Sequence, residues 1–269
     1  MDRRTARLLN GVLALCCLAI VFAAVCPFST ASPHAANPVD ARFTVPESDE
    51  YRATGAIVVD GETALEFEGA VTADGGRYQF IDEGTVRTEQ YQASPGDPVY
   101  SRIVVEEDDS TDRQRDHIQR DPDQELLREN RTGETVTFIL KGEPRDMVDA
   151  ISGTASVVVR SLYVTGYERK ADEPQDANVY KPRNGWYDGT EPYRVTGATG
   201  DVQTAADTTA VRSATVAWDQ TRPAGTYAEF GLVRLTSDAP RTYDLSFEFD
   251  SGETTVNQPA WVTAVRTES

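Results

Sequence analysis

Short runs of alternating apolar and polar residues dominate the chain after residue 50. In YDLSFEF (Tyr243–Phe249) apolar side chains occupy every second position, with Asp, Ser and Glu between them. ALEFEGAV (Ala64–Val71) likewise places Leu65 and Phe67 on one side and two Glu on the other. A period of two puts one side of a strand in the core and the other in water. The pattern therefore predicts an antiparallel sheet with one buried face and one acidic, solvated face.

Shorter alternating runs predict the rest of the sheet. Turn-forming residues separate them at short intervals, in the sequences ADGG, SPGDP, RPAG and SDAP. Short strands joined by short turns are typical of an antiparallel meander, whereas a parallel sheet needs a helical crossover between strands. The additional predicted strands are Arg77–Ile81, Thr85–Tyr91, Val99–Val105, Thr135–Leu140, Ser213–Trp218 and Tyr227–Leu235.

Two stretches depart from this alternation and predict helices. DPDQELLREN (Asp121–Asn130) begins with an Asp suited to the N-cap, then Pro at the first helical position and Gln124 at the third. The second predicted helix is Arg145–Val164, because its apolar residues follow steps of three and four. A strand through SVVVRSLYV is the alternative for that stretch, since β-branched residues favour sheets. The apolar positions of the second helix are Val148, Ile151, Ala155, Val158 and Leu162.

A short sequence occurs twice, as EYRATGA at Glu50–Ala56 and as PYRVTGA at Pro192–Ala198. After each copy come a predicted strand, a turn and a strand that begins near a Tyr, and the longer predicted helix falls between the two copies. Two related meanders can pair into one wide curved sheet with a helix on its apolar face. The repeat therefore indicates either a duplicated half-sheet or a chance recurrence of residues common in strands.

The charge of the chain is strongly negative. It has 44 acidic and 26 basic residues, for a net charge of −18, and three of the basic residues are Lys. Such a surface repels phosphate backbones, so we expect no nucleic-acid partner. Abundant acid with scarce Lys is typical of proteins from extremely halophilic archaea, where charge maintains solubility in salt. A cation site at Glu106–Asp109 is the alternative use of the acid, although the spacing lacks the central Gly of a calcium loop.

The N-terminal residues predict export. Arg3, Arg4 and Arg7 precede an apolar run, Leu8–Phe28, that is long enough to span a bilayer. We therefore expect residues 1–28 to be a signal or membrane anchor, whether retained or cleaved, and residues 29–49 to be a flexible tether. Residues 50–264 would then form one domain on the extracellular face of the cell membrane, or a secreted domain after cleavage.

Residues suited to catalysis or metal binding are scarce. The three Cys lie between residues 16 and 26, and His117 is the only His beyond residue 40. These counts disfavour a disulfide framework, a thiolate metal site and a Ser-His-Asp triad. We therefore expect no enzyme, and we assign no catalytic residue, cofactor or metal.

The order of these features resembles the periplasmic lipoprotein-carrier superfamily, which includes LolA-type carriers and LppX-like lipoproteins. The resemblance covers about Tyr51–Val262: a meander, an apolar helix, GWYDGTEPYRVTGATGDV, ATVAW and a closing TVNQPAWV. It implies an α+β fold, an incomplete barrel made of one curved antiparallel sheet with one or two helices on its concave face. It also implies a bound hydrophobic chain, with the helix as a movable lid.

The predicted function is therefore that of a membrane-tethered extracytoplasmic domain that binds or carries a lipid-like ligand. The alternative is a non-enzymatic cell-surface structural or interaction module with a fully packed core. Trp186, Tyr187 and Trp218 are the candidate ligand-binding residues, although aromatic residues also fill cores. Asn130, in the sequence Asn-Arg-Thr, is a candidate N-glycosylation site.

Overall fold

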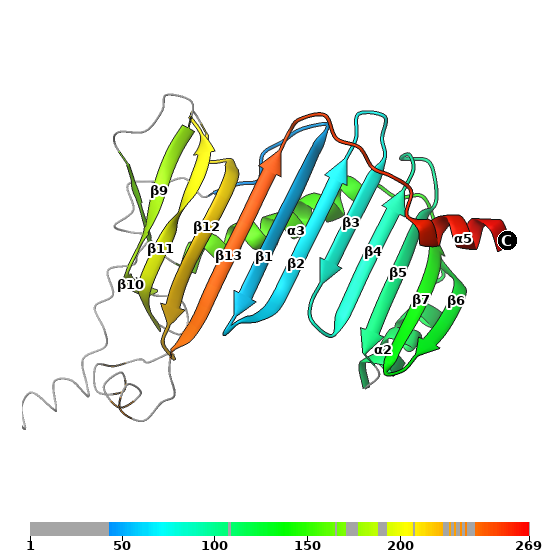
Figure 1. Ribbon diagram of the computed structural model, residues 1–269, viewed down its shortest axis with the longest axis horizontal. Helices are drawn as coiled ribbons and strands as arrows, with labels where there is room; N and C mark the ends of the chain where they lie inside the picture. The colour runs from blue at the N-terminus through cyan, green and yellow to red at the C-terminus, as the bar shows by residue number, and fades with distance from the viewer. Residues whose placement is uncertain are drawn as a thin grey trace, which may run out of the picture.

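A single broad sheet dominates the computed structural model (Figure 1). The structure describes residues 43–106, 109–164, 166–170, 177–187, 193–206, 208–222 and 240–268, and the single positions 226, 229, 232 and 235. Its strands are β1 (Tyr51–Val59), β2 (Glu62–Val71), β3 (Arg77–Asp82), β4 (Val86–Gln92), β5 (Val99–Glu106), β6 (Gln124–Thr132), β7 (Thr135–Gly142), β8 (Gly166–Arg169), β9 (Ala177–Arg183), β10 (Gly185–Tyr187), β11 (Tyr193–Ala205), β12 (Val211–Gln220) and β13 (Arg241–Asp250).

All neighbouring strands of this sheet run antiparallel. Their order is β6-β7-β5-β4-β3-β2-β1-β13-β12-β11-β9-β8, and β10 also pairs with β11. The sheet does not close into a barrel, since β6 and β8 stand at its two ends. The predicted fold class, a curved antiparallel sheet with few helices, is therefore confirmed.

Helices lie on both faces of the sheet. They are α2 (Asp109–Arg120), α3 (Met147–Ser161), which ends in a short 3-10 turn at Leu162–Val164, and α5 (Ala260–Glu268). We call the face that carries α2 and α3 the inner face, and the other the outer face. On β5, Val99 packs in the α3 cluster and Val105 packs with Ile118 of α2, so both helices cover the same face. Figure 1 shows α2 and α3 behind the strands and α5 in front.

The main core lies between α3 and the inner face. Residues on β13 alternate as predicted, with Leu245, Phe247 and Phe249 buried and their neighbours exposed. Because α3 crosses β13, β1, β2 and β3, these inward side chains pack against the apolar stripe of the helix. The predicted helix Arg145–Val164 is confirmed, with Asp146 as its N-cap.

The C-terminal residues cover part of the outer face. The segment after β13 runs along one end of the strands and delivers α5 to β4, β5 and β7 (Figure 1). There, Val262 and Val265 pack on Tyr91, Tyr100 and Ile139. The apolar surface of these strands is thereby removed from water.

The predicted helix Asp121–Asn130 is wrong. Most of these residues form β6, and the helix α2 lies upstream, in a polar stretch where the sequence analysis predicts no helix. In β6 the backbone pairs with β7 through a hairpin that turns at Gly133, whose φ of 62° suits a glycine. The pairing with β7 outweighs the helix-start signal of Asp121 and Pro122.

One further local prediction differs from the structure. The described positions 229, 232 and 235 are helical, although the sequence predicts a strand at Tyr227–Leu235. The closing TVNQPAWV stretch leads into α5, with the Val262 amide donating to the Pro259 carbonyl oxygen at 3.0 Å. Proline suits the start of a helix because it has no amide hydrogen to donate there.

The transmembrane and signal-anchor assignment is corrected. In the part of the chain that the structure describes, no helix has both the length and the apolar character to cross a membrane. The predicted anchor, residues 1–28, and most of the predicted tether lie outside the described residues. A membrane anchor therefore has no part in the function proposed below.

Candidate functional site

Between α3 and α2, the inner face carries a band of half-buried aliphatic side chains. We call this band the inner strip. All of its side chains retain contact with water, although their neighbours beneath the two helices are buried. They belong to five successive strands of the sheet, β1 to β5, and pack at the borders of the two inner-face clusters. The inner strip consists of Ile57, Leu65, Ile81, Val86 and Ile103.

Strand register makes the inner strip continuous. Ile57 lies directly opposite Leu65, and Ile81 and Ile103 both lie opposite Thr88 of β4. Leu65 and Ile81 are diagonal neighbours, because Ile81 pairs with Phe67, two residues from Leu65 on the same face. Directly paired side chains are about 5 Å apart and diagonal ones about 7 Å. Adjacent strip residues are therefore within contact range of one extended chain laid across the strands.

Helix α3 forms a fixed wall beside the inner strip. A Cβ added to Gly69 of β2 would lie 2.4 Å from Cγ2 of Ile151, and one added to Gly55 of β1 would lie 3.0 Å from Cγ1 of Val158. The helix thus sits directly on the glycine backbone of two strands. Such close packing leaves no space beneath this part of the helix, so we interpret α3 as a wall and not as the movable lid expected from the resemblance.

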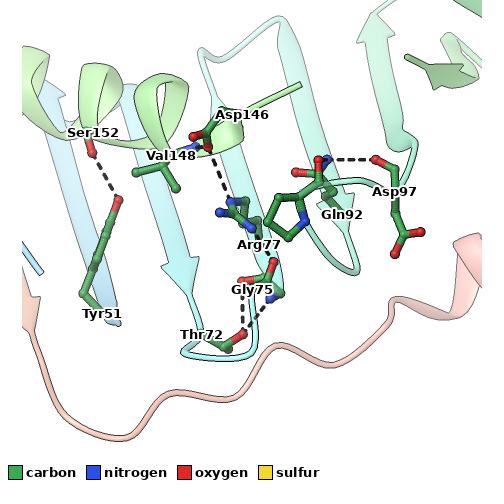
Figure 2. Close-up of polar contacts among 11 residues, drawn as sticks. Tyr51, Thr72, Gly75, Arg77, Gln92, Asp97, Asp146, Val148 and Ser152 are labelled. Atoms are coloured by element: carbon green, nitrogen blue, oxygen red, sulfur yellow. Dashed lines mark hydrogen bonds and ion pairs between the residues drawn. The ribbon is translucent and has the colours of Figure 1, made fainter. Parts of the chain in front are cut away.

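Polar contacts hold the N-terminal half of α3 in place (Figure 2). The Asp146 carboxylate accepts from the Val148 amide at 2.9 Å and forms an ion pair with Arg77 Nε at 3.6 Å. Arg77 also donates to the carbonyl oxygen of Gly75. The Arg77 side chain is 10% exposed, so this neutralising partner offsets much of the cost of its burial. These contacts fix the start of α3 over β3.

Gln92 of β4 completes this polar corner. It lies directly opposite Arg77, is fully buried, and donates through Nε2 to the carbonyl oxygen of Asp97 at 2.8 Å. Its Oε1 and the Arg77 Nε have no hydrogen-bond partner among the described residues. A buried polar atom without a hydrogen-bond partner lowers stability, so these two atoms are an energetic cost of the packing at this corner.

Two ionisable groups flank the corner. Burial raises the pKa of Tyr51, whose hydroxyl lies 3.2 Å from the Ser152 hydroxyl on α3. The Asp74 carboxylate accepts from the Thr72 hydroxyl, and this hydrogen bond lowers the pKa of Asp74. Tyr51 therefore stays neutral and Asp74 stays charged at neutral pH. No group of three or more His, Cys, Asp or Glu among the described residues is arranged to hold a metal.

The predicted aromatic residues belong to the two strands, β10 and β12, that pair with β11. Trp218 on β12 is buried and stacks on Tyr243, with ring centroids 5.2 Å apart and an interplanar angle of 2°. Trp186 and Tyr187 belong to β10, where they pair with Arg194 and Tyr193 at the start of β11. The next residue of β11, Val195, pairs with Gln220 at the end of β12. The side chains of Trp186 and Tyr187 lie outside what the structure describes. Their role in ligand binding stays a prediction.

Sequence reasoning missed the inner strip as a site. Alternation in β2 placed Leu65 on the buried side of its strand, which is correct. Ile81 shares its side of β3 with Arg77 and Gln79, so no apolar period marks it. The position of α3 decides which inward residues are covered, and that depends on contacts distant in sequence. The predicted glycosylation residue Asn130 lies elsewhere, exposed on β6.

Comparison with known proteins adds no family assignment. No family model matches the chain, and no curated protein matches it.

Proposed function

We propose that this protein is an extracytoplasmic domain that binds the extended hydrocarbon chain of a lipid-like ligand along the inner strip. The observation that carries the proposal is the continuity of half-buried aliphatic side chains across five adjacent strands. A surface of this shape matches a linear apolar chain better than a compact polar molecule. The resemblance to lipoprotein carriers supports the same class of ligand. We propose a location outside the cytoplasm because Arg3, Arg4 and Arg7 precede the apolar run Leu8–Phe28 in the sequence.

Binding would be driven by removal of apolar surface from water. Each buried methylene of a ligand contributes about 0.8 kcal/mol, so a chain that contacts only part of the strip gains several kcal/mol before the costs of association. The net charge of −18 disfavours an anionic head group. We therefore propose a neutral lipid-like ligand. This function requires no catalytic step.

Substitution on one strand tests this proposal with an internal control. Leu65→Asn places a polar group in the inner strip, whereas Glu66→Asn changes the adjacent, exposed residue of the outer face. We expect Leu65→Asn to weaken binding of a fluorescent diacylglycerol about tenfold, the equivalent of about 1.4 kcal/mol, and Glu66→Asn to leave it unchanged. Native mass spectrometry of the purified wild-type protein should detect co-purified lipid. Equal affinity for the two variants would refute binding at the strip.

A second candidate function, a structural or interaction module with a packed core, is favoured by the contact of α3 with Gly55 and Gly69. In that case the inner strip contributes only to stability. The two candidates differ in the wild-type protein itself. Absence of co-purified lipid, together with no measurable affinity for diacylglycerol, would favour the interaction module over the lipid-binding domain.

A further inference from the structure

We propose that Asn130 carries an N-linked glycan and that this glycan covers the free edge of β6. The proposal rests on the extracytoplasmic location proposed above, but not on lipid binding. Asn130-Arg131-Thr132 fits the acceptor pattern for N-glycosylation, and it is the one such pattern among the six Asn residues of the sequence. A three-residue pattern is common by chance, so the argument depends on where the fold places it.

The strand presents both functional side chains of the pattern on one face. Asn130 lies opposite Thr137 and Thr132 lies opposite Thr135, so both point to the outer face. Residues two apart on a strand are about 7 Å apart and share a face. Both are exposed, and neither the Asn130 carboxamide nor the Thr132 hydroxyl has a side-chain hydrogen bond among the described residues.

Exposure of this kind is not general for the asparagines of the sheet. Asn178 on β9 is buried, and its amide donates to the Ala206 carbonyl oxygen at 2.7 Å. Such an amide is neither accessible nor free to react. Asn130 is thus both an acceptor by sequence and an accessible amide by position.

The backbone of β6 gives the glycan a physical consequence. β6 is the end strand of the sheet, and among the described strands it pairs only with β7. An extended backbone with one unpaired side is available to the glycosylating enzyme, and it is also available to the edge strand of another molecule. A bulky, hydrated glycan at Asn130 would hinder the second kind of contact.

The reaction transfers a glycan from a lipid-phosphate carrier. The Asn130 side-chain nitrogen forms a bond to the anomeric carbon of the glycan, while the bond from that carbon to the carrier phosphate oxygen breaks. The lipid phosphate leaves with the electron pair, and the amide loses one proton to a base of the transferase. No oxidant or reductant is needed.

Site-mapping mass spectrometry of the full-length protein purified from its own cells tests the modification. We expect a glycan mass on the peptide that contains Asn130, lost in Asn130→Gln and in Thr132→Val, which removes the hydroxyl but keeps the side-chain shape. Thr132→Ser retains the hydroxyl and should retain the glycan. Circular dichroism checks that each variant is folded. An unmodified Asn130 in the wild-type protein overturns the proposal.

Protease accessibility on intact cells separates the two ways in which the test can fail. Unmodified protein that is cleaved from outside refutes the glycan while the proposed location stands. Unmodified protein that is protected inside the cell refutes the location as well. Sedimentation velocity tests the edge: Asn130→Gln should self-associate at concentrations where the wild type and Thr132→Ser are monomeric. A monomeric Asn130→Gln overturns the edge-covering role.

Discussion

Strands β1 and β11 both begin with Tyr-Arg and both have Gly at the fifth position, but the two glycines meet different constraints. Gly55 of β1 faces α3, where an added Cβ would lie 3.0 Å from Val158. Gly197 of β11 has a φ of 63° and lies at a register shift opposite β12. One glycine allows a helix to approach, and the other allows the backbone to turn left-handed.

The tyrosines differ in the same way. Tyr51 is 3% exposed, stacks on Phe249 with ring centroids 5.0 Å apart, and contacts Ser152 on α3. Tyr193 is only half-buried at the border of the same core. The repeat therefore recurs in strands, as a duplication would require, yet its residues perform different tasks. Similar residues in two strands indicate a similar extended backbone. They do not imply that the side chains make similar tertiary contacts.

The largest expected difference between the two copies comes from their tyrosines. Tyr51→Ala should lower the free energy of unfolding by about 3–5 kcal/mol, because it leaves a cavity beneath α3. Tyr193→Ala should cost about 1–2 kcal/mol, since this side chain is already partly hydrated. Urea unfolding at constant salt measures both losses. Equal losses would mean that the two copies are energetically equivalent.

The glycines sharpen the comparison because they respond to different replacements. Gly55→Ala should cost about 1–3 kcal/mol by forcing α3 away from β1, and Gly55→Asn should cost more because Asn is larger. Gly197→Ala should cost about 1–2 kcal/mol, and here Asn should cost less than Ala because Asn tolerates left-handed backbone. Thermal unfolding of the four variants shows, at each position, whether the Ala or the Asn variant loses more stability. The same order at both positions would contradict the distinction.

The pH dependence of stability tests the buried tyrosine of β1. Burial raises the pKa of Tyr51 above 10.0, so in the folded protein this phenol stays neutral where an unfolded one ionises. Its stabilising contribution is complete below about pH 10 and is lost as the pH rises through the folded pKa. Tyr51→Phe should therefore cost about 1 kcal/mol at neutral pH and make the fall in stability above pH 10 less steep. If the slope of stability against pH is unchanged, another group causes the loss of stability at alkaline pH. Tyr78 is one such group, because burial raises its pKa as well.

The smallest effect is expected on the outer face, at Arg52. Its guanidinium lies 3.0 Å from the Glu68 carboxylate, and the two side chains are 54% and 34% exposed. An exposed pair of this kind contributes less than about 1 kcal/mol and is screened by salt. A double-mutant cycle of Arg52→Ala and Glu68→Ala should give a small coupling energy at low salt and none in molar salt. A large coupling energy between Arg52 and Glu68 that persists in molar salt would mean that ion pairs on the outer face contribute substantially to stability.

The alternation of apolar and polar residues was enough to predict the central strands β2 and β13. It was not enough to predict the elements near the end of the sheet, β6 and α2. β2 and β13 bury one face and expose the other, so period two is visible in their sequences. β6 is exposed along most of its length, and therefore nothing in its sequence alternates. α2 is almost entirely polar and is supported by pairs such as Arg120–Asp116, spaced as on a helix, with Ile118 as a buried anchor. Neither element has an apolar period to detect.

The candidate site was predictable only in part. The sequence indicates which side of β2 is apolar, and hence that Leu65 points inward. On β3 the inward side carries Arg77 and Gln79 beside Ile81, so alternation does not identify it.

The sequence does not indicate where α3 crosses that face, because the crossing is set by contacts such as Gly69 with Ile151, far apart in the chain. The unpaired atoms of Arg77 and Gln92 likewise result from tertiary packing.

The position of β13 has a consequence for how the protein is made. β13 is the last strand in the sequence, yet it lies between β1 and β12, where Asp250 pairs with Arg52. No other described strand connects the part of the sheet synthesised first to the part synthesised later. Until β13 has been synthesised, the edge of β1 stays open, so the two parts of the sheet cannot join before translation has passed residue 250. Pairing over such a sequence distance is slow, and a chain that stops at residue 240 should yield two meanders with exposed, aggregation-prone edges.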